Sequence, residues 1–184
     1  GLNIVAGCGF YIDASHPSHL KRQTVDEIGV ISKDISSGIG DTGIRAGIIG
    51  EIGRGWPFSE GEEKVLRASA RAHLATKAPI NVHPYPFGKF ALSIIEILEE
   101  EGVDLHNVVL SHIDESGFDM NYHKSLAKKW VYIGYDTFGS EVYFDSIGTL
   151  DPRDTERVTA VVDMTRSGFA SQLLLSHDVC LKTH

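Results

Sequence analysis

The sequence predicts an α/β fold of the (β/α)8 barrel type. Short apolar runs rich in β-branched residues recur along the chain, and segments of helical length separate them. Strand–helix units of roughly thirty residues imply parallel strands joined by right-handed crossovers. Four of the runs end at side chains that can bind a metal, namely Glu51, His83, His112 and Asp178. Because the C-terminal ends of barrel strands meet on one face, we expect these side chains to converge.

Six strands and five helices are expected along the chain. The expected strands lie at residues 3–9, 46–53, 78–83, 107–112, 130–136 and 172–178. The expected helices lie at residues 24–37, 59–77, 90–101, 119–129 and 155–166. A complete barrel typically needs about 250 residues, and this chain has 184. We therefore expect an incomplete barrel that covers roughly strands 3 to 8.

Local patterns define some of these elements more closely. The capping-box spacings T-x-x-E from Thr24 and S-x-x-E from Ser59 predict two helix starts. The apolar spacing places Leu74 and Leu92 on the core-facing sides of their helices. Residues 137–152 have no periodicity, so we expect a long loop that shapes a substrate pocket.

Composition excludes several classes of function. The net charge is −8 without any basic run, which argues against nucleic acid as a partner. Cys8 and Cys180 follow no disulfide or zinc-finger spacing, and this suits a reducing compartment such as the cytoplasm. No apolar stretch is long enough to span a membrane and no signal peptide is visible, so no membrane partner is expected.

The chemistry of the four strand-end side chains suits a metal centre. Carboxylates and imidazoles bind zinc, manganese and similar ions. Two such ions about 3.5–4 Å apart can hold a hydroxide between them and polarise the bond under attack. The sequence shows no G-x-S-x-G elbow, no G-x-G-x-x-G after a strand and no P-loop. The pattern therefore favours a metal site over nucleophilic or nucleotide chemistry.

Each candidate also has a purely structural interpretation. A strand-end histidine can simply be a hydrogen-bonded part of the fold, and Asp178 could cap a short helix. Glu51 could form an ion pair with Arg45 or Arg54. His16 and His19 are further candidate ligands, and the alternative for them is an exposed polar loop. The metal interpretation depends on the equivalent positions of all four candidates in successive strand–helix units.

Several motifs resemble the phosphotriesterase-like family of the amidohydrolase superfamily, particularly the branch called phosphotriesterase-related proteins. The matching stretches are Gly9-Phe10-Tyr11, Gly47-Ile48-Ile49-Gly50-Glu51-Ile52-Gly53, Trp56-Pro57, Val82-His83-Pro84, Ser111-His112, Tyr135-Asp136-Thr137-Phe138-Gly139 and His177-Asp178. They occur in the family's order over nearly the whole chain. The resemblance implies a barrel with two divalent metal ions, expected to be zinc, and hydrolysis by a metal-bound hydroxide.

The resemblance also implies roles for individual residues. Glu51 matches the bridging ligand, where founding members use a carbamylated lysine. His83 and His112 match the two histidines of one metal. Asp178 matches a ligand of the other metal and the proton acceptor, so Asp178 and Glu51 are the expected catalytic residues. Tyr11 and Tyr135 match positions that line the substrate pocket.

One family motif is missing from the sequence. The family's first strand carries a His-x-His pair that holds the metal shared with Asp178, and this chain has no such pair. We therefore interpret residues 1–184 as one partial hydrolase domain without the first two strands and the last helix. On this interpretation the chain alone binds at most one metal tightly, and it is insoluble or associates through open sheet edges.

The sequence thus predicts a metal-dependent hydrolase that cleaves an ester, lactone, amide or phosphoester bond in a small molecule. One alternative is a hydrolase of N-acyl amides, either amino acid or sulfonic acid conjugates. Another is a non-catalytic barrel protein, or an inactive fragment, that binds at most one metal. A cytoplasmic homodimer is the expected assembly.

Overall fold

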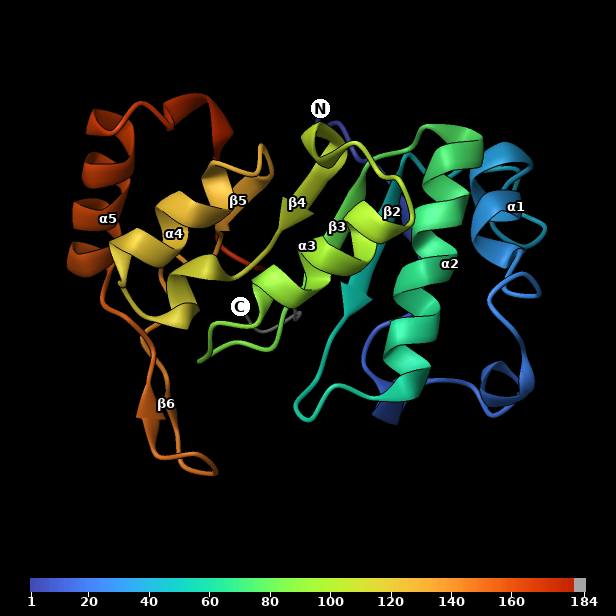
Figure 1. Cartoon of the computed structure of the whole chain (residues 1–184), viewed down its shortest axis with the longest axis horizontal. Helices are drawn as coiled ribbons and strands as arrows, with labels where there is room; N and C mark the ends of the chain where they lie inside the picture. Colours follow the sequence, from blue (N-terminus) through green and yellow to red (C-terminus); the bar gives the residue numbers. More distant parts are fainter. Residues whose placement is uncertain (181–184) are drawn as a thin grey trace. The chain divides into compact units, whose positions relative to one another are not determined.

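The structure is a computed structural model that describes residues 1–180, and the chain divides into two compact units. Unit 1 contains residues 1–85 and 90–109, whereas unit 2 contains residues 86–89 and the chain from residue 110 onward. Both units combine parallel strands with α-helices (Figure 1). The short strand β4 (Val108–Leu110) begins in unit 1 and ends in unit 2.

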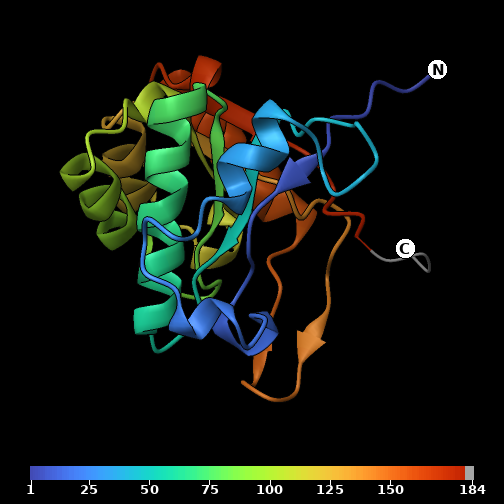
Figure 2. The same ribbon diagram turned by 90° about the vertical axis from the view of Figure 1, so that its right-hand side faces the viewer.

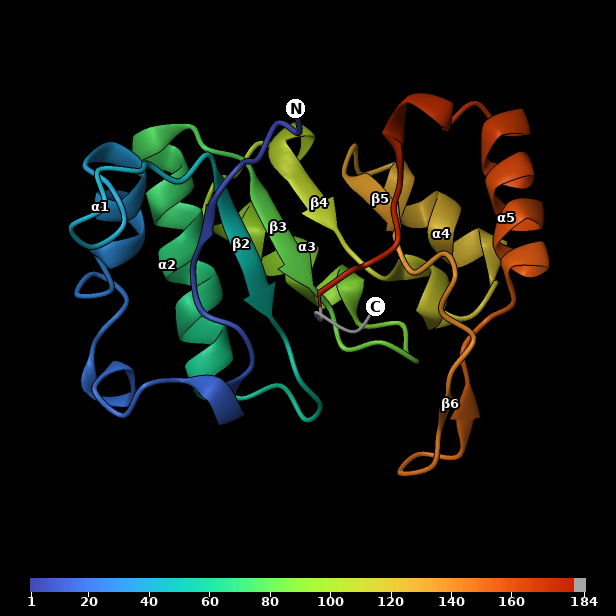
Figure 3. The same ribbon diagram turned by 180° about the vertical axis from the view of Figure 1, so that it is seen from behind.

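Unit 1 is a parallel sheet with helices packed on one face. Its strands are β1 (Gly7–Cys8), β2 (Ile48–Gly53) and β3 (Ile80–His83), which are hydrogen-bonded neighbours in that order. Its helices are α1 (Val30–Ser36), α2 (Glu60–Thr76) and α3 (Ala91–Glu100). The views from the front and from behind place α2 and α3 on the same side of β2 and β3 (Figures 1 and 3). Helix α1 packs beside α2 (Figure 2).

The core of unit 1 holds β2 and β3 against α2 and α3. Ile49 and Ile80 of the strands are fully buried, as are Val65 of α2 and Leu98 of α3. Burying one such side chain contributes about 1.5–3 kcal/mol to stability. Apolar packing of this kind fixes the strands, and so fixes where their C-terminal ends place Glu51 and His83.

The described part of unit 2, which ends at residue 180, contains a parallel strand pair, two α-helices and a small hairpin. The parallel strands are β5 (Tyr132–Tyr135) and β8 (Leu173–Leu175), with Ile133 opposite Leu173. The helices are α4 (Met120–Ala127) and α5 (Asp154–Arg166). Strands β6 (Tyr143–Phe144) and β7 (Thr149–Leu150) form an antiparallel hairpin that projects away from α4 and α5 (Figure 1).

The described residues have strands at all six predicted places and α-helices at all five. The helix expected at residues 24–37 is wrong at its start, because α1 begins only at Val30. Thr24 does form the local contact, since its backbone N–H donates to the Glu27 carboxylate over 2.7 Å, but turns follow it. Hydrogen bonding at a capping box thus does not propagate a helix by itself.

Three further expectations are corrected. The strand expected at residues 3–9 is only Gly7–Cys8, and Ile4 before it is 88% exposed. The loop expected at residues 137–152 contains the β6–β7 hairpin, whose strands of two residues are too short to show periodicity. Leu74 and Leu92 are each 38% exposed, so they are not core residues of this structure.

No helix among the described residues is both long and apolar enough to cross a membrane.

Candidate metal and substrate site

Glu51 and His83 lie side by side in unit 1 at the ends of β2 and β3. The register of these strands shifts between Ile49 and Ile52, and Glu51 lies within that irregular stretch. Such irregularities re-aim side chains and are common next to active sites. The Glu51 Oε2 atom is 3.5 Å from Nδ1 of His83. A carboxylate and an imidazole at this separation are suitable donors for one divalent cation.

Tyr11 lies over the His83 imidazole. Its hydroxyl is 3.0 Å from Nε2 of His83, and the two rings pack edge to face with centroids 4.8 Å apart. Gly53 allows this approach, because a Cβ there would collide with the backbone that follows Tyr11. The buried His16 supports the same segment by donating from Nε2 to the Tyr11 carbonyl over 2.7 Å. The His16 side chain is therefore buried, whereas His19 is exposed, as the structural alternative expects.

Glu62 fixes the loops after β1 and β2 to the start of α2. Its Oε1 accepts from the backbone N–H of Asp13 over 3.0 Å, and its Oε2 accepts from that of Ser59 over 3.0 Å. The Ser59 hydroxyl accepts from the Glu62 N–H over 3.1 Å, so the predicted capping box is formed. Because Glu62 is buried, these bonds are shielded from water and restrain the loop that carries Tyr11.

His112 follows β4 in unit 2 and is oriented by Asp136. The His112 Nδ1 atom is 2.9 Å from Oδ1 of Asp136, and the His112 backbone N–H donates to the same oxygen over 2.8 Å. Burial alone would raise the pKa of Asp136, but hydrogen bonds from His112 hold that pKa below its usual range. An ionised Asp136 keeps the proton on Nδ1, so the lone pair of a neutral ring is on Nε2. Metal-binding histidines typically have this arrangement.

Asp178 lines a pocket of unit 2 just beyond β8. The pocket has a volume of about 600 Å³. Its lining residues are Glu115, Thr137, Phe138, Gly139, Ser140, Val142, Phe144, His177, Asp178 and Val179. The edge-to-face contact of Phe87 with Phe144, whose ring centroids are 5.2 Å apart, supports its apolar wall. The pocket therefore combines carboxyl groups and hydroxyls with aromatic surface.

Glu115 is a protonated carboxyl group in this pocket near neutral pH. Burial and, to a smaller extent, the nearby Asp151 and Asp114 raise its pKa to about 8 against the opposing effect of His112. A protonated carboxyl group can donate a hydrogen bond, whereas an ionised one can only accept. Glu115 thus gives the pocket a donor that a count of acidic residues would not reveal.

A buried ionic network organises the loop that lines the pocket. Arg157 of α5 is fully buried, and its Nε donates to Oδ2 of the fully buried Asp114 over 2.9 Å. Its other nitrogens donate to the Thr137 hydroxyl over 2.8 Å, the Ser140 carbonyl over 2.8 Å and the Asp154 carboxylate over 2.9 Å. Burial raises the pKa of Asp114, although the bonds from Thr137 and Arg157 act in the opposite direction.

Tyr135 is placed differently from the expectation that it lines the pocket. Its side chain is fully buried and its hydroxyl is hydrogen-bonded to Nδ1 of His123. Burial raises the pKa of Tyr135 and lowers that of His123 to about 4, so both groups are neutral. Tyr135 is therefore a core residue of unit 2.

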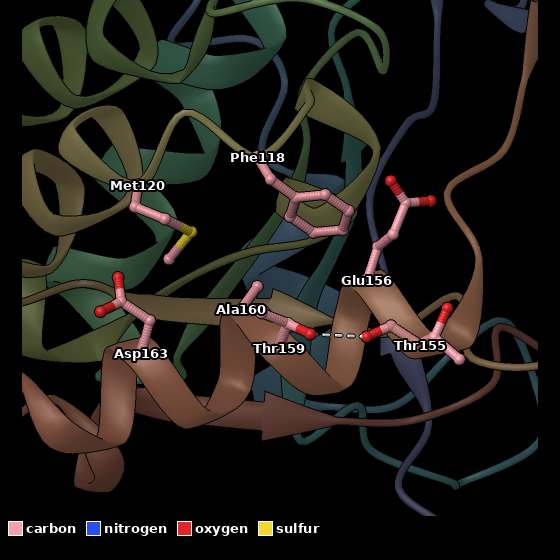
Figure 4. A pocket seen from close by; sticks show the side chains of 7 residues that line it. All are labelled: Phe118, Met120, Thr155, Glu156, Thr159, Ala160 and Asp163. Carbon is pink, nitrogen blue, oxygen red and sulfur yellow. Dashed lines mark hydrogen bonds between the residues drawn. The ribbon is translucent and has the colours of Figure 1, made fainter.

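A second pocket of unit 2 lies between α5 and the segment that leads into α4 (Figure 4). It has a volume of about 650 Å³. Its lining residues are Phe118, Met120, Thr155, Glu156, Thr159, Ala160 and Asp163. The Thr159 hydroxyl donates to the Thr155 carbonyl over 2.8 Å rather than into the space. None of the predicted site residues lines this pocket, so it is not the candidate site.

The structure therefore brings Glu51, His83 and Tyr11 together in unit 1 and places His112 and Asp178 in unit 2. The convergence of all four candidate ligands remains a prediction. The sequence interpretation missed the supporting role of Asp136, although this residue ends the strand predicted at residues 130–136, as His83, His112 and Asp178 end theirs. It also missed Arg157, for which the sequence offers no signal, because arginine is rarely fully buried.

The model of the Phosphotriesterase family matches residues 1–184 of the chain. The chain is 37% identical over 185 residues to the N-acetyltaurine hydrolase of Xenopus tropicalis, covering 99% of this chain and 53% of that relative. It is 36% identical over 186 residues to the N-acetyltaurine hydrolase of Homo sapiens, covering 100% of this chain and 53% of that relative. The chain thus spans about half the length of the curated relatives it matches.

Solved structures of other proteins share the fold. A resiniferatoxin-binding protein from Rhodobacter sphaeroides matches with a TM-score of 0.93 and 34% identity, over 97% of this chain and 50% of that one. The phosphotriesterase homology protein from Escherichia coli, which has phosphate in its active site, matches with a TM-score of 0.89 and 30% identity. That match covers 100% of this chain and 60% of the Escherichia coli chain. The predicted fold class, an incomplete (β/α)8 barrel, is confirmed.

Proposed function

We propose, from the premise that this chain belongs to the phosphotriesterase family, that it carries part of the active site of a metal-dependent hydrolase. The observation that carries the proposal is the pair of Glu51 and His83, whose donor atoms lie 3.5 Å apart at neighbouring strand ends. The Glu51 side chain is 32% exposed and the His83 side chain 13%, so both donor atoms are partly shielded from water while still open to an ion. Glu51 and His83 would together bind one divalent cation, which would offset the carboxylate charge.

The proposed metal ligands are Glu51, His83, His112 and Asp178, and the proposed ions are two divalent cations, zinc in the first instance. Two carboxylates and two imidazoles form a donor set that zinc accepts, and the Asp136–His112 bond is the outer contact expected of a ligand histidine. When bound, the ions would supply activation of water and polarisation of the scissile bond. Glu51 offsets their charge, and Asp178 takes the proton of the attacking water.

The proposed substrate class is an N-acyl amide, either an amino acid conjugate or a sulfonic acid conjugate. Its support is that two relatives, 36% and 37% identical, carry the name N-acetyltaurine hydrolase. The aromatic wall of the Asp178 pocket suits an acyl group, and the Tyr11 hydroxyl and protonated Glu115 suit a polar carbonyl. Esters, lactones and phosphoesters are the broader class to which the same chemistry applies.

The test uses the intact protein that carries these residues, loaded with zinc and supplied with N-acetyltaurine, an N-acyl amino acid, a lactone and a phosphotriester. Acetate release from the first compound should be fastest. Glu51→Gln keeps the shape of the side chain but removes its charge. The rate of acetate release should therefore fall by more than the about 10–100-fold loss that is typical when a residue that only contacts a metal ligand is replaced. Glu96→Gln, on the exposed face of α3, is the matched control and should leave the rate unchanged. Near-wild-type turnover by Glu51→Gln would exclude the proposal.

A second candidate function is ligand binding without turnover. It is favoured by the likeness to the resiniferatoxin-binding protein, at 34% identity. The same assay separates the two, because a binding protein would retain amides and lactones without cleaving them.

A cytoplasmic location and a homodimer are further proposals. The two cysteines are free, which suits a reducing compartment, and burial raises the pKa of the Cys8 thiol to about 11. Fractionation and light scattering of the intact protein test these two proposals.

A further inference from the structure

The segment at the end of β8 is hydrogen-bonded to the segment that follows β5, and both lie within unit 2. Beyond the paired residues Tyr135 and Leu175, the Ser176 N–H donates to the Tyr135 carbonyl over 3.3 Å. The Phe138 N–H then donates to the Ser176 carbonyl over 3.2 Å. Finally, Nδ1 of His177 lies 2.9 Å from the Phe138 carbonyl. Because a carbonyl can only accept, this ring nitrogen carries the proton and donates it.

Asp178 follows this last bond in an unusual backbone conformation. Its φ of 44° lies in the left-handed region, which residues other than glycine seldom adopt. Such conformations persist where surrounding contacts over-determine them, and they cluster at functional sites. The His177–Phe138 bond is a contact of that kind, because it fixes the residue immediately before Asp178.

The acceptor of that bond is itself held in place from α5. Phe138 lies between Thr137 and Gly139, and the Gly139 N–H donates to the Asp154 carboxylate over 3.0 Å. The Thr137 hydroxyl donates to Asp114 over 2.6 Å and accepts from the buried Arg157 over 2.8 Å. These bonds on both sides of Phe138 restrain its carbonyl, and they therefore restrain the His177 side chain that donates to it.

We propose that His177 is a positioning residue that sets the direction of the Asp178 carboxylate. The Nδ1–H bond to Phe138 selects the backbone turn from which Asp178 enters the pocket that both residues line. The inference rests on the proposed function, in which Asp178 binds a metal. It assigns to His177 a role that its own exposed position would not suggest.

The test compares His177→Ala and His177→Asn in the intact, zinc-loaded protein. The alanine removes the donor, whereas the asparagine amide can donate to the same carbonyl. His106→Ala is the matched control, because His106 makes a local bond of 2.9 Å to Asp104 on the surface of unit 1. Metal content after dialysis, kcat, KM and the thermal unfolding midpoint are measured for each variant.

His177→Ala should weaken metal retention about 10–100-fold and lower kcat, with KM changed less than about 2-fold. His177→Asn should restore most of both properties, and His106→Ala should match the wild type. Wild-type metal retention and kcat in His177→Ala would overturn the inference, as would His177→Asn behaving like the alanine. Loss of cooperative unfolding in His177→Ala would also overturn it, because the role would then be structural. A wild-type protein that binds no metal would instead remove the proposed function itself.

Discussion

Unit 1 places Glu51 and His83 directly against each other, whereas unit 2 fixes His112 and Asp178 through other residues. In unit 1 the donor atoms are 3.5 Å apart because neighbouring strands end together. In unit 2, Asp136 orients His112, and the Phe138 segment holds the residue before Asp178. The first arrangement depends on apolar packing and strand register, and the second depends on buried polar bonds.

The ion pairs of the two units differ in their burial. Arg67 of α2 binds Glu63, Glu100 and Glu101 at the surface of unit 1, with its side chain 25% exposed. Arg157 of α5 is fully buried with Asp114 in unit 2. Water can replace the partners of Arg67 but not those of Arg157. Unit 2 should therefore be far more sensitive to the loss of one charged side chain.

The largest expected effect is the loss of the Arg157 guanidinium. Arg157→Ala leaves the Asp114 carboxylate buried without its cation, so the free energy of unfolding should fall by about 3–5 kcal/mol. Arg67→Ala, the matched change in unit 1, should cost less than about 1 kcal/mol. Urea unfolding monitored by circular dichroism measures both values. Equal losses would show that the buried and exposed networks do not differ as described.

The next effect is the pH dependence that Glu115 confers on the metal-free protein. Burial raises its folded-state pKa to about 8 from the usual 4.5, so between these pH values the unfolded state releases a proton that the folded state keeps. Stability must therefore fall as pH rises through that window, on the order of a few kcal/mol. Glu115→Gln cannot titrate and should lose this slope. The free energy of unfolding of the wild type and of Glu115→Gln is measured in the presence of a chelator from pH 4.5 to 8. If both proteins show the same dependence on pH, Glu115 does not cause it.

A smaller effect is expected from Asp136. Asp136→Asn no longer fixes the His112 ring with a charge, so zinc affinity should fall about 10–100-fold while the fold persists. Asp163→Asn, which alters a surface ion pair with Lys124, is the control and should leave affinity unchanged. Competition with a chromogenic chelator reports the affinities. Unchanged zinc binding by Asp136→Asn would mean that His112 is not a ligand.

The smallest effect is expected at the helix caps, where the two units should behave alike. Ser59 caps α2 in unit 1, and Asp119 caps α4 in unit 2 by accepting from Asn121 and Tyr122. Replacing either residue by alanine should cost about 1 kcal/mol. A loss several times larger for Ser59→Ala would indicate that its bond to Glu62 also holds the Tyr11 loop, and thermal unfolding detects that difference.

What the sequence predicts well is local. The start of α2 follows from Ser59 and Glu62, because the cap and the apolar face that follows it agree. The same spacing at Thr24 fails, because only turns follow until Val30. The β6–β7 hairpin was missed, because strands of two residues are too short to carry a pattern.

In the candidate site, too, local patterns were predictable and contacts between distant residues were not. Glu51, His83, His112 and Asp178 could be proposed because each follows an apolar run, although their shared metal role stays a prediction. The Asp136–His112 and Arg157–Asp114 pairs could not be predicted from the sequence, because their members lie 24 and 43 positions apart. Tyr135 shows the converse, since its matching motif did not reveal that its side chain points into the core.

The proposed function requires Glu51 to bind the same metal centre as His83, His112 and Asp178. Crystals of the intact protein grown with zinc, measured on both sides of the zinc absorption edge, test it most directly. Two anomalous peaks about 3.5–4 Å apart are expected, with the Glu51 carboxylate between them. His83 and His112 should bind one peak, and Asp178 the other. A Glu51 carboxylate without a peak within bonding distance would rule out the proposed metal site.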